Sequence, residues 1–159
     1  MIFLKLLLIS ILGIIFYQDQ KDRMVYWFLY PIVGVVGFCI QLNFAVLEVL
    51  VLNSLINLIV IVTLLAVLWV YSKLIRKQSL INNGIGLGDI LFFVFLSFCF
   101  PIVTFILLFV FSLLFSLLLH ILIKNKNSAT IPLAGYMSLF FIFVYGLSFF
   151  ENGNFIFAY

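Results

Sequence analysis

The length of the uncharged stretches constrains the fold of this chain more than any other feature. Between Asp89 and Lys124 the sequence holds no Asp, Glu, Lys or Arg, and Leu, Phe, Ile and Val dominate it. A helix needs about 20 apolar residues to cross a bilayer, where every backbone polar group must be paired within the element. The stretch therefore predicts membrane-embedded helices. Its leucine- and phenylalanine-rich runs exclude barrel strands, which alternate polar and apolar residues.

The rest of the chain follows the same pattern. Hydrophobic residues make up 67% of the 159 residues, charged residues only 8%, and the mean hydropathy is +1.42. A soluble domain of this size carries far more polar surface. We therefore predict an all-α membrane protein that forms a single polytopic domain, residues 1–159, without a separate soluble domain.

Polar islands divide the chain into six predicted membrane spans. In chain order these are residues 2–17, 24–40, 47–71, 89–100, 102–123 and 132–150. Pro101 marks a tight reversal between the fourth and fifth spans, and Pro132 suits the first turn of the sixth. The fold class that we predict is a six-transmembrane-helix bundle, in which the fourth span is unusually short.

The basic residues predict the orientation of this bundle. Seven of the eight fall in the loops after the first, third and fifth predicted spans, and Lys5 is the exception. Because basic loops stay in the cytoplasm, these three loops are predicted to be cytoplasmic and the protein to lie in the cytoplasmic (inner) membrane. The net charge of +3 is then explained by topology and indicates no nucleic-acid partner.

Metal ligands do not cluster in the sequence. Cys39 and Cys99 lie far apart within apolar runs, which is typical of buried thiols, and His120 is the only histidine. We predict that the protein binds no metal and needs no cofactor.

The most informative polar stretch is Asn82-Asn83-Gly84-Ile85-Gly86-Leu87-Gly88-Asp89, directly before an apolar run. An acid at a membrane boundary is a candidate functional group, and an Asp before a helix is also a favoured N-cap; the sequence leaves both interpretations open. Glycines at every second position would bare one side of an extended backbone, so we predict that Gly86 and Gly88 contact substrate. No βαβ pattern or Gly-Lys-Ser/Thr supports a nucleotide-binding loop.

Asp19 ends the first predicted span, and the predicted topology places it on the same membrane face as Asp89. Two neighbouring carboxyl groups suit an aspartic peptidase, in which one is ionised and activates water while the other is protonated and polarises the scissile carbonyl. Like charges a few ångströms apart do not both ionise, so the pair is expected to hold one proton.

These residues resemble a family. Gly86-Leu87-Gly88-Asp89 at the start of a span matches the Gly-x-Gly-Asp motif of the type IV prepilin peptidases and their archaeal preflagellin relatives. In that family an earlier Asp is followed seven residues on by a Pro; here Val25-Tyr26-Trp27 stands there without the Pro, and the spacing selects Asp19 over Asp22. Ile131-Pro132-Leu133-Ala134-Gly135 is similar to the start of the family's late helix.

The resemblance covers the whole chain and implies cleavage of the short basic leader of prepilin-like or pseudopilin precursors at the cytoplasmic membrane face. It implies that Asp19 and Asp89 are catalytic. Larger members of the family add a cytoplasmic zinc-binding domain and methylate the new terminus; this chain has neither the length nor the Cys-x-x-Cys pairs, so no methyltransferase domain is expected.

Three alternatives stay open. Presenilin-like intramembrane proteases share Gly-x-Gly-Asp and carry a Pro-Ala-Leu string, whereas Pro132-Leu133-Ala134 has that composition in another order. A small transporter or channel subunit would carry its acids at mid-span. In a structural membrane protein, Asp89 would be a helix cap and Asp19 a solvated loop charge.

Overall fold

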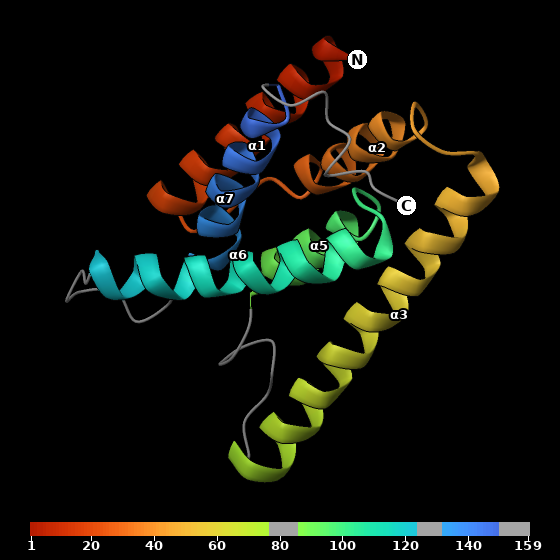
Figure 1. Cartoon of the computed structure of the whole chain (residues 1–159). Helices are drawn as coiled ribbons and strands as arrows, with labels where there is room; N and C mark the ends of the chain where they lie inside the picture. Colours follow the sequence, from red (N-terminus) through yellow and green to blue (C-terminus); the bar gives the residue numbers. More distant parts are fainter. Residues whose placement is uncertain (77–85, 124–131, 150–159) are drawn as a thin grey trace.

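The structure is a computed structural model and describes residues 1–76, 86–123 and 132–149 (Figure 1). Within these residues the chain is helical and contains no strand, which confirms the all-α prediction. The elements are α1 (Ile2–Lys21), α2 (Leu29–Gln41), α3 (Leu47–Tyr71), a π-helical turn η1 (Ser72–Arg76), α5 (Leu87–Leu96), α6 (Ile102–Leu122) and α7 (Leu133–Leu147).

Three of these helices are long and apolar enough to cross a membrane. They are α1, the continuous helix Leu47–Leu74 that begins as α3, and α6. The remaining helices α2, α5 and α7 contain 13, 10 and 15 residues. At 1.5 Å per residue these are about 15 to 23 Å long, less than the ~30 Å hydrocarbon core. Membrane character is thus shown by three helices, fewer than the six spans expected.

The predicted boundaries agree best where an apolar run ends at a clear break. The third span matches α3 residue for residue, and the fifth differs from α6 by one residue. The first was predicted to end at Tyr17, but α1 continues to Lys21 because Gln and Lys are good helix formers, and Arg23 follows at a positive φ of 54°. The second begins at Leu29 instead of residue 24.

The fourth and sixth spans are also shorter than predicted. Helix α5 ends at Leu96, before residue 100, and α7 runs from Leu133 to Leu147. Pro132 is the N-cap of α7, directly before the helix, and Pro101 is the N-cap of α6, as expected of residues that cannot continue a preceding helix.

Helices α1 and α7 are antiparallel neighbours (Figure 1), since each end of α1 makes a hydrogen bond to the opposite end of α7. Residues of α2, α5 and α6, with Ile61 of α3, complete the core. Its largest side chains are aromatic and come from α2, the segment 92–105 and α7: Tyr30, Phe92, Phe93, Phe100, Phe105, Phe141 and Tyr145. Rings stack or meet edge to edge across these elements, as between Phe100 and Phe141.

Glycines let α2 pack closely on α5. A Cβ on Gly34 would lie 3.1 Å from the carbonyl oxygen of Phe95, and one on Gly37 would collide with the thiol of Cys99. Small residues at helix contacts are the usual device for bringing backbones together in membranes. Cys99 is buried and Cys39 half-buried, and neither forms a disulfide.

The end of α5 lies inside the protein, where its last carbonyl groups need partners. The side-chain amide of Asn57 on α3 donates hydrogen bonds to the carbonyl oxygens of Ser97 (3.1 Å) and Phe100 (2.9 Å). The amide of Gln41 on α2 donates to the carbonyl oxygen of Phe98 (2.8 Å). Both amides are buried, and they pair carbonyl groups of residues 97–100, where the chain leaves α5 within the apolar part of the fold.

Candidate active site at the start of α7

The first turn of α7 holds both predicted catalytic carboxylates. The backbone N–H groups at a helix start have no partner within the helix, and they carry the positive end of its dipole. The N–H of Ala134 donates to Oδ1 of Asp89 (2.9 Å), and the N–H of Gly135 donates to Oδ2 of Asp19 (2.6 Å). Two residues 70 positions apart in the sequence are therefore bound by consecutive peptide groups.

Asp19 stands in an unfavourable place on its own helix. It lies in the last turn of α1, where the negative end of the dipole repels a carboxylate, and it is only 9% exposed. The start of α7 compensates through Gly135. A Cβ on that glycine would lie 2.9 Å from Oδ2 and 3.1 Å from Cβ of Asp19, so this close approach depends on the absence of a side chain.

Asp89 is not the N-cap of its helix, which corrects one of the two interpretations of this residue. The N-cap of α5 is Gly86, and Asp89 is the third helical residue, half-buried. Its carboxylate accepts a hydrogen bond from the backbone N–H of Gly86 as well as from Ala134. The bond to Gly86 is half of a capping box, in which an acidic side chain reaches back to the N-cap N–H.

Gly86 and Gly88 do not form one extended segment. Gly86 is extended and exposed, whereas Gly88 lies in the first turn of α5; Gly84 falls outside the described residues. The position that a Cβ would take on Gly88 is 2.7 Å from the hydroxyl oxygen of Tyr30. Contact of the two glycines with substrate stays a prediction, and the structure gives Gly88 a second reason to lack a side chain.

Tyr30 is the residue that the sequence interpretation missed. Tyr26, Trp27 and Tyr30 stand at the start of an apolar stretch, where aromatic side chains are typical of the headgroup boundary. Tyr26 and Trp27 are 63% and 71% exposed, but Tyr30 is only 1% exposed, and it interacts electrostatically with both Asp19 and Asp89. A usable signal existed, because Tyr30, Gly34 and Gly37 follow helical spacing and define the face of α2 that packs on α5.

Asp22 and Arg23 lie at the edge of the site. Asp22 is the exposed C-cap of α1, whereas Asp19 is buried and accepts a hydrogen bond from the start of α7. Arg23 follows with its backbone in the left-handed region and interacts electrostatically with Asp19. Among the described residues, no group of three His, Cys, Asp or Glu is close enough to hold a metal.

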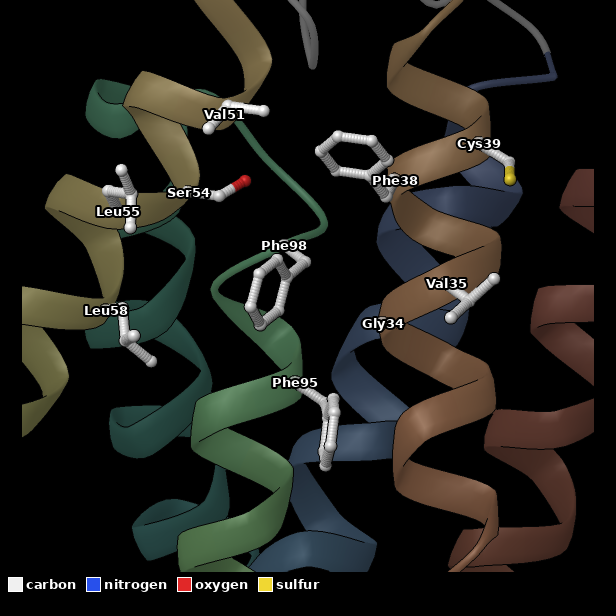
Figure 2. A pocket seen from close by; sticks show the side chains of 10 residues that line it. All are labelled: Gly34, Val35, Phe38, Cys39, Val51, Ser54, Leu55, Leu58, Phe95 and Phe98. Carbon is white, nitrogen blue, oxygen red and sulfur yellow. The ribbon is translucent and has the colours of Figure 1, made fainter. Parts of the chain in front are cut away.

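A separate apolar groove of about 390 Å³ opens between α2 and α3, with α5 at its base (Figure 2). Gly34 and Phe38 of α2 face Val51 and Leu55 of α3 across it. Ser54 also lines the groove and is the most polar residue there; its hydroxyl has no hydrogen-bond partner among the described residues. Neither carboxylate borders this groove, so it is distinct from the site at the start of α7.

Comparison with known proteins identifies no relative of this chain. No family model matches the chain, and neither does any curated protein or solved structure. The case for the site therefore rests on the residues and their geometry.

Proposed function

We propose that this protein is a membrane-embedded aspartic endopeptidase that uses Asp19 and Asp89 and cleaves the leader peptide of prepilin-like precursors at the cytoplasmic membrane face. One observation carries the proposal: the consecutive N–H groups of Ala134 and Gly135 hold two carboxylates that come from different helices. One carboxylate is the usual side-chain cap of a helix start, and a second brings repulsion between like charges. The second acid is therefore retained for chemistry that needs two.

The arrangement supports water-mediated peptide hydrolysis. The ionised carboxylate takes a proton from water while the oxygen attacks the scissile carbonyl carbon, and the protonated carboxyl donates to the carbonyl oxygen. The resulting tetrahedral diol collapses as the C–N bond breaks, and the leaving amine takes a proton from the pair. The helix dipole of α7 favours the single negative charge that the pair carries through these steps.

The position of the site suits a substrate with a membrane helix and a water-exposed leader. Asp19 follows a run of apolar residues in α1, and Asp89 precedes one in α5. In the six-span topology that we propose, both ends face the cytoplasm, beside basic loops. An apolar precursor helix in the bilayer would then present its leader junction to the carboxylates, and the exposed, extended backbone at Gly86 leaves room for an extended peptide to approach Asp89.

Co-expression with a prepilin-type precursor tests the proposal. A precursor with a short basic leader should be shortened on a gel when the intact protein is present, and mass spectrometry of the product should place the cut at the leader junction. Asp89→Asn serves as the inactive control, since Asn keeps the size of the side chain and removes its acid–base function. Unprocessed precursor beside correctly inserted protein would overturn this function.

A presenilin-like protease is a second candidate, because Pro132-Leu133-Ala134 forms the start of α7 and its third residue binds Asp89. The two candidates differ in where they cut. A cut within the precursor's membrane helix, in place of the leader junction, would favour the presenilin-like alternative.

A further inference from the structure

Each oxygen-bearing side chain of the site lies against a glycine. Oδ2 of Asp19 faces Gly135, Oδ2 of Asp89 faces Gly86 at 3.2 Å from the position of a Cβ, and the hydroxyl of Tyr30 faces Gly88 at 2.7 Å. The first two are the proposed catalytic acids. The third occupies an equivalent place, on the residue directly before Asp89, and has no role in the function proposed so far.

The position of the Tyr30 hydroxyl is fixed by the fold. The ring is buried and meets Phe92 of α5 edge to edge, with 6.2 Å between the ring centroids. Phe92 lies three residues after Asp89 on the same helix, so the contact holds the ring beside the first turn of α5. The hydroxyl oxygen moves away from Gly88 only if the whole side chain swings about χ1, which would break this aromatic contact.

Among residues 1–76, 86–123 and 132–149, the charged groups that act on Tyr30 are both acidic. Asp19 from α1 and Asp89 from α5 both interact with it electrostatically, and Arg23 acts on Asp19. Helix α2 itself contains no charged residue, and α7 contributes the N–H groups of Ala134 and Gly135. A neutral phenol between two acids is a hydrogen-bond donor in a place where negative charge accumulates.

We propose that Tyr30 is a third catalytic residue of this site, whose O–H donates a hydrogen bond to the substrate carbonyl oxygen as it gains negative charge. This inference rests on the proposed peptidase function. The protonated carboxyl and the phenol then share the developing charge, and neither group forms or breaks a covalent bond to carbon. A preorganised donor of this kind costs no rearrangement at the moment of reaction.

The first experiment tests the geometry without using activity. In Gly88→Ala the new methyl group meets the Tyr30 hydroxyl oxygen, whereas the next atom of that ring, Cζ, is 3.6 Å away, an ordinary contact. Gly88→Ala should lower the thermal midpoint of the purified protein in detergent, and adding Tyr30→Phe should restore it. If Tyr30→Phe leaves the loss unchanged, the hydroxyl does not lie over Gly88 and the inference fails.

The second experiment measures cleavage of the leader-bearing precursor by Tyr30→Phe. Loss of one oxyanion donor lowers kcat about 10²- to 10³-fold in known hydrolases, so we expect a loss of that order with little change in KM. The thermal midpoint should stay near that of the unmodified protein, because the ring and its contact with Phe92 are kept. Tyr26→Phe, on an exposed ring of the same segment, is the matched control and should cleave normally.

The outcomes separate the two proposals. Normal kcat in Tyr30→Phe together with no cleavage by Asp89→Asn would overturn the role of Tyr30 and leave the peptidase function standing. Normal cleavage by Asp89→Asn would overturn the peptidase function itself, and the inference about Tyr30 with it. An increase in KM at constant kcat would make Tyr30 a binding residue and would also contradict the proposal.

Discussion

The two ends of the α1–α7 pair carry charges of opposite sign, one basic residue at one end and two acidic residues at the other. At one end a single cation, Lys5, donates from Nζ to the carbonyl oxygen of Ser148 (3.1 Å) and lies over the ring of Phe149. At the other end, two anions, Asp19 and Asp89, accept from the start of α7. Both ends complement the dipole of α7, and Lys5 is buried as Asp19 is.

The unequal number of charges at the two ends of α7 favours the acidic end as the functional one. Lys5 shows that one buried charge is sufficient to satisfy an end of α7. The acid end has one charge more than a cap requires, and it has a third polar group, Tyr30, against the same helix start. Substitutions at the two ends should consequently have different effects. Those at the acid end should lower cleavage, and those at the lysine end should lower stability.

The largest expected effect is the loss of cleavage at the acid end. Asp19→Asn and Asp89→Asn should each lower the rate by about 10³-fold or more, since an amide accepts the same backbone hydrogen bonds but does not transfer protons. The double variant should be no slower than either single variant, because the two acids act as one unit. The precursor gel assay measures all three.

Asp22→Asn is the matched control for this experiment, since Asp22 is three residues away and exposed. It should cleave at a near-normal rate. An essential Asp22 beside a dispensable Asp19 would show that the wrong acid has been paired with Asp89, and the comparison between the two ends of α7 would lose its basis.

The next effect is on the pH dependence of cleavage. Because one carboxylate must be ionised and its partner protonated, kcat/KM should rise and then fall with pH, with about tenfold loss per pH unit on each side. Lys5→Met should keep the same profile, since Lys5 lies at the far end of α7. A profile that stays flat from pH 4 to 8 would contradict a shared proton.

A smaller effect is expected from Gly135→Ala. The added methyl group would push the Asp19 carboxylate away from the N–H of Gly135. Cleavage should fall by roughly tenfold to a hundredfold, as expected when a catalytic group is displaced by about an ångström. Gly146→Ala is the control on the same helix, since nothing lies within 4 Å of the position of its Cβ. Equal loss in both variants would indicate general damage to α7.

The smallest effect on cleavage is expected at the lysine end. Lys5→Met leaves the carbonyl of Ser148 without its donor, and the free energy of unfolding should fall by about 1 to 3 kcal/mol, measured by denaturant titration in detergent. Cleavage per folded molecule should stay within about twofold. Lys21→Met, an exposed lysine at the other end of α1, should leave stability nearly unchanged. A loss of cleavage without a loss of stability in Lys5→Met would contradict the assignment of stability to the lysine end and cleavage to the acid end.

The sequence predicted the helical class and the bounds of α3 and α6 from apolar run lengths, and it singled out Asp19 and Asp89, which the structure places at the same helix start. It did not predict the roles of Tyr30, Gly135 or Lys5. Each of these depends on a contact between helices that are distant in sequence, and such contacts leave no local pattern. The N-cap interpretation of Asp89 was wrong because the helix begins three residues earlier, with Gly86 as its N-cap.

Helix α5 connects the long helix α3 to the Asp89 carboxylate and can transmit movement between them. The segment directly after it, residues 97–100, is tied to α3 through Asn57 and to α2 through Gln41, while its first turn is tied to α7 through Asp89. A rod of only 10 residues that is anchored at both ends transmits a push along its axis with little bending. We therefore expect that a change in bilayer thickness that tilts the long α3 reaches the Asp89 carboxylate through α5, so that cleavage depends on lipid chain length.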